Sequence, residues 1–173
     1  MNGIVIYKSR YGAAKQYAEW IAKAFNIGVM NSDEVKSTDL IKCDYVIAGS
    51  SIYIGKILIK DWLSQNREIL KNKKIFLFIV GAAPPNEKEK TGKYFTDNIS
   101  KELLAQSSCF YLQGKSIFKE LNWSDKFFLK MGAMLAKEAH DKKAMLTDFN
   151  AIKKESLNEL LHAVEEFQKL ETK

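Results

Sequence analysis

The loop that follows the first apolar run combines a glycine, hydroxyl groups and basic side chains between Lys8 and Lys15. It leads from the run Gly3–Tyr7 directly into a helical pattern. A glycine allows a tight turn, and the unpaired backbone N–H groups at a helix N-terminus attract an anion such as a phosphate. An ordinary turn between a strand and a helix uses the same residue types, so this loop alone leaves both interpretations open. The residues that would hold the anion are Ser9, Arg10, Tyr11, Gly12, Ala13, Ala14 and Lys15.

Two further loops are rich in small residues and follow the apolar runs Tyr45–Gly49 and Ile75–Gly81. Beside an anion-binding loop, they would form a slot for a flat ring whose phosphate tail lies in the first loop. Tyr53 by itself is more typical of a packed surface aromatic, and the cofactor interpretation is favoured only when the three loops are combined. The candidate residues are Ser50, Ser51, Ile52, Tyr53 and Gly55 in the second loop and Gly81, Ala82, Ala83 and Pro84 in the third.

Other signatures of cofactor and catalytic sites are absent from the sequence. It contains no G-x-G-x-x-G and no G-x-S-x-G, and Gly49–Lys56 lacks both the spacing and the following Ser or Thr of a P-loop. A phospho-accepting receiver domain would need carboxylates after the first strand, where Lys8, Ser9 and Arg10 stand instead. Two distant cysteines and two histidines indicate neither a metal site nor a disulfide framework. No side chain is therefore nominated as catalytic.

Strand and helix patterns alternate along the chain. The predicted strands are Gly3–Tyr7, Ile27–Asn31, Tyr45–Gly49, Ile75–Gly81 and Cys109–Leu112. Apolar residues at helical spacing predict helices over Ala13–Phe25, between Ile59 and Ile69, over Glu87–Leu104 and near the C-terminus, where Asp148 is a candidate N-cap. This rhythm predicts an α/β three-layer sandwich, with a five-stranded parallel sheet of order 2-1-3-4-5 and helices on both faces. Ligands bind such sheets beyond the carboxyl ends of the strands, where the three loops lie.

A segment of about residues 115–147 is longer than a usual connection between a strand and a helix, which takes about 2–6 residues. Ser124 is a candidate N-cap within it, and Phe127, Met131, Met134 and Leu135 form one apolar stripe. The segment carries seven lysines and four acidic residues. Such a basic amphipathic helix could hold an anionic substrate or contact a membrane. The alternative, a stripe packed on the sheet with solvated lysines, is the commoner fate of such helices and stays open.

Length and composition are consistent with one globular domain over residues 1–173. The chain has 46% hydrophobic and 28% charged residues, which is typical of a folded protein. Its formal net charge of +6 favours anionic partners. Neither a signal peptide nor a run long enough to span a bilayer is evident, so a cytoplasmic location is expected.

On these loops the sequence resembles the flavodoxin family over nearly its whole length. The stretch Ser9–Ala14 stands where the family binds the FMN phosphate, and Gly49–Tyr53 stands where its first isoalloxazine loop lies. The resemblance implies noncovalent FMN, with the ring held between the second and third loops. The family's phosphate loop usually ends in a Thr or Ser hydroxyl, whereas Ala13 and Ala14 offer only backbone amides.

Within that family the chain looks most like the menaquinone-dependent protoporphyrinogen IX dehydrogenase type. This likeness rests on Tyr7–Gly12, on the Gly-Ser-Ser-Ile-Tyr segment and on the long segment after the fifth strand. It implies an FMN-dependent oxidoreductase that oxidises protoporphyrinogen IX or a similar anionic substrate and passes electrons to a quinone, with peripheral contact to the membrane. The residues expected at the substrate or the membrane are Trp123, Lys126, Phe127 and Lys130.

Two other functions are alternatives to this one. A flavodoxin-type electron carrier would bind FMN and turn over no small substrate, but such carriers are typically acidic, as the resemblance implies. A nucleic-acid-binding domain is permitted by the charge, yet no DNA- or RNA-binding motif is present, so no nucleic-acid partner is expected.

Overall fold

A parallel sheet forms the centre of the structure, a computed structural model that describes residues 1–135, 142 and 146–171. Its strands run in the order β2-β1-β3-β5-β6, and every neighbouring pair is parallel, which confirms the predicted strand order. A short strand, β4 (Lys56–Ile57), pairs antiparallel with the end of β3. The five parallel strands are β1 (Gly3–Lys8), β2 (Gly28–Asn31), β3 (Tyr45–Tyr53), β5 (Lys74–Gly81) and β6 (Ser107–Gln113).

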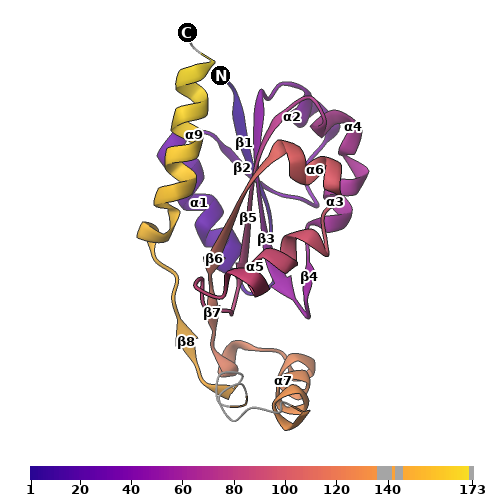
Figure 1. Cartoon of the computed structure of the whole chain (residues 1–173), viewed down its shortest axis with the longest axis vertical. Helices are drawn as coiled ribbons and strands as arrows, with labels where there is room; N and C mark the ends of the chain where they lie inside the picture. Colours follow the sequence, from indigo (N-terminus) through magenta and orange to yellow (C-terminus); the bar gives the residue numbers. More distant parts are fainter. Residues whose placement is uncertain (136–141, 143–145, 172–173) are drawn as a thin grey trace.

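Helices cover both faces of the sheet, which gives the three layers (Figure 1). One face packs against α1 (Ala13–Phe25) and α9 (Asn158–Leu170), the latter preceded by a 3-10 turn, Lys154–Leu157. The helices on the other face are α2 (Ser37–Ile41), α3 (Lys60–Gln65), α4 (Arg67–Leu70), α5 (Lys88–Thr96) and α6 (Lys101–Gln106).

Side chains alternate along the central strands and therefore feed two hydrophobic cores. Ile47 and Phe78 point to the α1 and α9 side, whereas Val46 and Leu77 point to the opposite core. Because helices cover both faces of the sheet, these strands are continuous apolar runs in the sequence rather than alternating apolar and polar residues. Gly49 fits beside Phe78 only because it has no side chain: a Cβ there would lie 2.0 Å from the Phe78 ring.

Several predicted element boundaries were wrong. The helix expected over Glu87–Leu104 is two helices, α5 and α6, because Ser100 starts a new one by accepting a hydrogen bond from the Leu103 N–H. The helix expected between Ile59 and Ile69 is likewise divided, into α3 and α4. Asp148 is no helix cap, since its carboxylate accepts a hydrogen bond from the Phe118 N–H.

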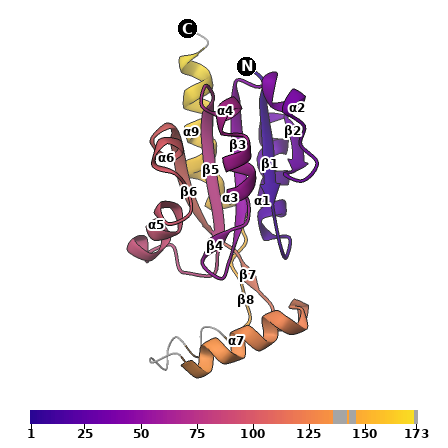
Figure 2. The same cartoon turned by 90° about the vertical axis from the view of Figure 1, so that its right-hand side faces the viewer.

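The insertion after β6 stands beyond the carboxyl ends of the strands (Figure 2). Strands β7 (Lys115–Ser116) and β8 (Phe149–Asn150) pair antiparallel as its stem, and a 3-10 turn (Phe118–Glu120) leads to α7 (Trp123–Leu135). Part of the predicted range 115–147 lies outside the described residues. Among those described, no helix is both long and apolar enough to cross a membrane.

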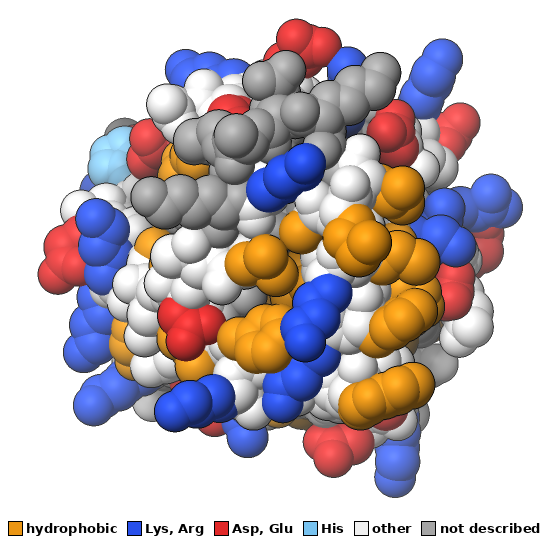
Figure 3. Space-filling model, turned by 90° about the horizontal axis from the view of Figure 1, so that it is seen from below, with side chains coloured by type: hydrophobic (Ala, Val, Ile, Leu, Met, Phe, Trp, Pro, Cys, Tyr) orange, Lys and Arg blue, Asp and Glu red, His pale blue; other side chains and the backbone are white. Residues whose placement is uncertain are grey.

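The structure corrects one prediction for the insertion and decides between two alternatives for its apolar stripe. Asn122, not Ser124, is placed to cap α7, because its side-chain oxygen accepts a hydrogen bond from the Asp125 N–H at 2.8 Å. The apolar stripe does not pack on the sheet. Its members are exposed on the outer side of α7, where Figure 3 shows hydrophobic and basic side chains gathered on one face; they are Phe127, Met131, Met134 and Leu135.

Candidate functional site

The first loop ends in an uncapped helix N-terminus. Gly12 stands at the N-cap of α1 in the left-handed conformation, with φ +83°, and no side chain caps the first turn. A Cβ at Gly12 would meet nothing within 4 Å, so the space beside the turn is open. The Ala13 and Ala14 side chains are buried in the core, so this turn can present only backbone N–H groups to a ligand. An open turn of amides at the positive end of a 13-residue helix suits a phosphate.

The Arg10 side chain is committed to the insertion. Its Nε and one terminal nitrogen donate to the two carboxylate oxygens of Asp125, at 2.8 and 3.0 Å. Tyr11 donates its hydroxyl to the same carboxylate, and the Tyr53 hydroxyl donates to it at 2.6 Å. The Arg10 guanidinium also lies 3.9 Å from the centre of the Tyr53 ring. We call these four residues the Asp125 clamp; it joins the first loop, the second loop and α7.

Charge within the Asp125 clamp is balanced, and its carboxylate is held away from water. Only 5% of Asp125 is exposed. Burial alone raises the pKa of this carboxyl, but the hydrogen bonds from Arg10, Tyr11 and Tyr53 outweigh burial and hold the pKa below its usual value. The same hydrogen bonds raise the pKa of Arg10 and of Tyr53, so the pair stays ionised and the phenol stays protonated.

The second loop is mostly strand. Residues 50–53 continue β3, and the chain reverses at Ile54 and Gly55, which both have positive φ, 48° and 73°. The prediction of an open loop from Gly49 onward was therefore wrong. The Ser50 hydroxyl is buried and bonded to the protein backbone. It donates a hydrogen bond to the Ser51 carbonyl and accepts one from the Ile59 N–H.

Asn98 holds the β3–β4 turn against α5. Its amide nitrogen donates to the carbonyls of Gly55 and Tyr94, at 3.0 and 2.9 Å, while its amide oxygen accepts from the Ile57 N–H at 3.1 Å. The side chain is buried, with 7% exposed. The sequence offered no sign of this role, because Asn98 lies 43 residues from Gly55.

The third loop is fixed to β6 through its carbonyl groups. The Gly81 carbonyl accepts from the Gly114 N–H at 2.9 Å, and the Ala83 carbonyl accepts from the Tyr111 hydroxyl at 2.9 Å. A Cβ on Gly81 would lie 2.7 Å from that hydroxyl oxygen, so this position tolerates only glycine without rearrangement. The loop is thus rigid and close to the second loop, because the Ile52 side chain also approaches Gly81.

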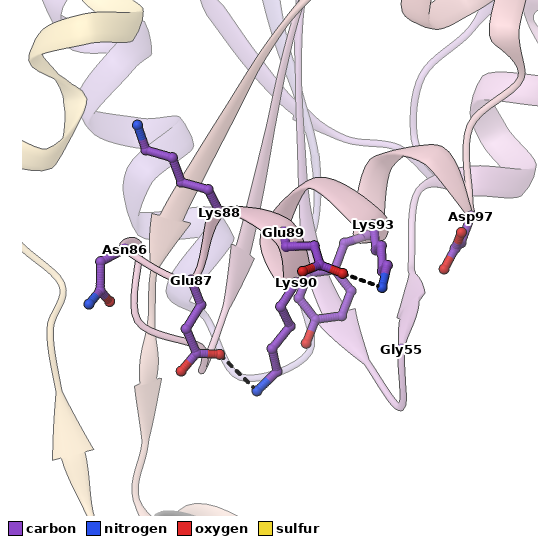
Figure 4. A pocket seen from close by; sticks show the side chains of 9 residues that line it. Gly55, Asn86, Glu87, Lys88, Glu89, Lys90, Lys93 and Asp97 are labelled. Atoms are coloured by element: carbon purple, nitrogen blue, oxygen red, sulfur yellow. Dashed lines mark hydrogen bonds and ion pairs between the residues drawn. The ribbon is translucent and has the colours of Figure 1, made fainter.

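A pocket of about 810 Å³ opens between the β3–β4 turn and α5 (Figure 4). Its size is within the usual range for small-molecule sites, about 300–1,000 Å³. Of the predicted cofactor residues only Gly55 lines it. The other lining residues are Asn86–Lys90, Lys93, Tyr94 and Asp97. Charges on α5 pair with one another along its wall, Lys90 with Glu87 and Lys93 with Glu89.

The predicted residues thus fall into separate groups. The first and second loops meet, with the Ser9 and Ser51 hydroxyl oxygens 3.5 Å apart. Lys15 does not join them, because its ammonium group forms an exposed ion pair with Glu19 on α1. Lys126 and Lys130 lie together on α7, each with its Nζ 5.7 Å from the centre of the Phe118 ring. Trp123 is 81% exposed and stacks on Phe127.

Asp125 is the residue of the site that sequence reasoning missed. It lies 115 residues from Arg10 and within a lysine-rich segment, so no local spacing marked it. One signal was present, an acidic residue in the first turn of a predicted helix. Such a residue is usually attributed to the helix dipole.

Comparison with known proteins gives a family match. A family model described as a flavodoxin domain matches residues 4–143. No curated protein matches the chain. Similar solved structures include a flavodoxin from the domain Archaea, with 21% identity over 69% of this chain and 88% of that chain and a TM-score of 0.43.

Two further structures are similar at comparable levels. A WrbA-like flavodoxin from Agrobacterium tumefaciens has 17% identity over 84% of this chain and 90% of that chain, with a TM-score of 0.47. A flavoprotein from Lactobacillus acidophilus, solved in complex with FMN, has 14% identity over 65% of this chain and 91% of that chain, with a TM-score of 0.45.

Proposed function

The chain belongs to the flavodoxin domain family, and from this premise we propose that it is an FMN-dependent oxidoreductase. The observation that carries the proposal is the open, uncapped N-terminal turn of α1 at Gly12, which suits the FMN phosphate. Ser9 precedes this turn in the first loop, and its hydroxyl oxygen lies 3.5 Å from that of Ser51 in the second loop. When bound, FMN supplies the hydride or electron transfer, while the protein binds and orients it.

The chain's own residues have defined tasks in this proposal. The amides of Ala13, Ala14 and Lys15 hold the phosphate, because no hydroxyl side chain stands in that turn. The rigid third loop and the Asn98-held β3–β4 turn form the walls beside the ring. The Asp125 clamp keeps Arg10 charged and oriented, and it closes α7 over the junction of the first two loops.

FMN binding is tested by titration, followed through the visible spectrum of the flavin. Riboflavin lacks the phosphate and is expected to bind at least about 30-fold more weakly, because charge-assisted hydrogen bonds to the helix terminus contribute about 2 kcal/mol. Gly12→Ala is expected to weaken FMN about tenfold, since a left-handed alanine costs about 1–2 kcal/mol and shifts the turn.

Gly28→Ala is the matched control, because Gly28 lies in β2, has no positive φ and offers equally open space to a Cβ. It is expected to bind FMN as the unchanged protein does. Equal binding of riboflavin and FMN, or no flavin binding at all, would overturn the proposal.

The finer part of the proposal concerns the electron donor. We propose an anionic, planar substrate such as protoporphyrinogen IX, with a quinone as the acceptor. Lys126 and Lys130 support it, since their neighbouring ammonium groups on α7 could pair with two carboxylates. Anaerobic mixing of the FMN-loaded protein with protoporphyrinogen IX is expected to bleach the flavin. This reaction should slow in Lys126→Ala/Lys130→Ala.

A protein that binds FMN but is not reduced by this donor would instead be an electron carrier. Its reduction would then depend on a protein partner. The net charge of +6 supports the substrate alternative, because it disfavours docking on basic redox partners.

A further inference from the structure

Helix α7 presents an apolar face to solvent at the end of the molecule that carries the proposed flavin site (Figures 2 and 3). Trp123 and Met134 are each 81% exposed, Leu135 is 76% exposed and Phe127 is 52% exposed. Phe128 and Met131 add to the same helix surface. A contiguous exposed surface of this kind is unusual for a soluble monomer and marks an interaction site.

The opposite side of α7 is anchored, so the apolar face has a fixed direction. Asp125 and Ala133 are the buried residues of the helix. Asp125 is held by Arg10, Tyr11 and Tyr53, all of which belong to the main body of the protein. The exposed side chains therefore belong to a helix that is tied to the sheet through its other side.

Basic side chains border this apolar face. Lys126 and Lys130 lie one helical turn apart, and Lys119 lies in the preceding 3-10 turn. None of the three forms an ion pair with a described acidic side chain. Between residues 115 and 135 both carboxylates are already engaged, Glu120 by Lys115 and Asp125 by Arg10. Over these described residues the surface is therefore apolar with an uncompensated positive border.

We infer that α7 docks this protein on an anionic membrane surface, with its apolar face among the acyl chains and its lysines at the headgroups. Helices that lie in a membrane interface have this combination of bulky apolar residues and a basic border. Lysine stems can extend along apolar surface while their ammonium groups stay in water, as Lys126 and Lys130 would do here. Trp is favoured at the headgroup level, which is where Trp123 would lie.

A second copy of the chain fits this face less well. Pairing two α7 faces would bring the bordering lysines of both copies together, and like charges at an interface oppose association. An anionic bilayer has the complementary charge. The inference does not depend on FMN, although docking through α7 would bring the proposed flavin site near a membrane-dissolved quinone.

Sedimentation with lipid vesicles tests the inference, using the full chain with and without FMN. Binding is expected to phosphatidylglycerol vesicles at low salt, with much weaker binding to phosphatidylcholine and a loss of affinity as salt rises. Lys126→Gln/Lys130→Gln is expected to weaken binding roughly 30-fold, from about 1 kcal/mol per basic residue near an anionic surface. Phe127→Ser/Met131→Ser is expected to weaken it by on the order of tenfold or more.

Matched controls are exposed residues of the same types that lie outside the insertion. Lys23→Gln/Lys42→Gln removes the same charge from exposed sites outside the insertion, and Ile41→Ser removes an exposed apolar side chain from α2. Both controls should bind vesicles as the unchanged protein does. Brominated lipids should quench Trp emission, and Trp123→Phe should abolish that quenching.

Three results would overturn the inference. The first is no binding to phosphatidylglycerol vesicles at low salt. The second is binding that survives both α7 variants or quenching that survives Trp123→Phe, which would place the contact elsewhere. The third is a dimer in light scattering that Phe127→Ser/Met131→Ser dissociates, which would make a second copy the occupant. Failure of FMN binding would leave all three readouts unaffected.

Discussion

At the scale of single residues, Asp125 determines how the insertion is attached to the sheet. Asp125→Asn keeps the shape of the side chain but removes the charge that Arg10 contacts through both of its hydrogen bonds. We expect a loss of about 1–3 kcal/mol in the free energy of unfolding, because hydrogen bonds to charged groups contribute in that range and a partly buried Arg10 is left unpaired. Urea denaturation measures the change.

Asp33→Asn is the matched control for that substitution. Asp33 also forms a single ion pair, with Lys8, but 67% of its side chain is exposed. Exposed pairs contribute about 0–1 kcal/mol, so a small effect is expected. Equal losses in the two variants would contradict a special role for the Asp125 clamp.

The Asp125 clamp should also make stability depend on pH in a defined direction. The folded-state pKa of Asp125 lies below its unfolded value of about 4. The unfolded chain therefore takes up the proton first as pH falls, and the contribution of the ionised carboxylate is complete above pH 4–5, roughly, and is lost below it. The difference in unfolding free energy between the unchanged protein and Asp125→Asn should shrink from pH 7 to about pH 3. A constant difference would contradict this assignment.

Ile54 adopts a backbone conformation that its side chain disfavours. A β-branched residue at φ +48° is strained, and Ile54 is 66% exposed, so it packs little in return. Asn is favoured at the first position of a two-residue turn with two positive φ values. Ile54→Asn should therefore stabilise the protein by about 1 kcal/mol, measured by urea denaturation, while Gly55→Ala should destabilise it. A loss of stability in Ile54→Asn would show that Ile54 makes a contact worth more than the strain.

At the scale of elements, Asn98 joins the β3–β4 turn to α5. Asn98→Ala leaves the buried Ile57 N–H and the Gly55 carbonyl without this partner. We expect a loss of about 2–3 kcal/mol in the free energy of unfolding, since a buried unsatisfied group costs about 1–3 kcal/mol. Asn72→Ala, at an exposed position, should change stability by less than about 0.5 kcal/mol. Similar values for both variants would mean that water replaces the Asn98 contacts.

The elements show where sequence patterns are sufficient and where they are not. Strand order and α1 followed from apolar runs and helical spacing, because burial on both faces leaves a continuous signal. The break between α5 and α6 was missed since the apolar spacing continues through it. α5 ends at Thr96, and Ser100 begins α6 by accepting a hydrogen bond from the Leu103 N–H. The extension of β3 to Tyr53 was missed because its small residues resemble a loop. It is a strand because residues 50 and 51 pair with β5 and residues 52 and 53 pair with β4.

At the scale of the whole molecule, topology predicts that the three loops meet, but not what else joins them. Parallel strands bring their carboxyl ends to one edge, which is why Ser9 and Ser51 could be placed together from the sequence. The Asp125 clamp connects segments more than a hundred residues apart, and no periodicity encodes that contact. The exposure of the α7 stripe is likewise a tertiary property, because the same spacing occurs in helices that pack on a sheet.

The insertion should be separable from the rest of the protein. Its two ends are joined directly, since the Ala151 N–H donates to the Gly114 carbonyl at 3.0 Å. Neither hydrophobic core includes a described residue of the range 115–150. Replacing 115–150 with two or three glycines, roughly the length of a tight turn, should therefore leave a chain that unfolds in one cooperative transition in urea. Its stability should fall by about the amount that Asp125→Asn costs, because the Asp125 clamp is the main side-chain connection that is removed.

The shortened chain also separates the two proposed activities. It keeps Gly12 and the α1 amides, so FMN should still bind more tightly than riboflavin, with an affinity change no greater than about tenfold from the freed Arg10 and Tyr53. It lacks α7, so phosphatidylglycerol vesicles should no longer bind it. A shortened chain that folds but binds FMN no more tightly than riboflavin would place the cofactor site in the insertion rather than at α1. One that folds and still binds vesicles would assign membrane contact to the remaining basic surface.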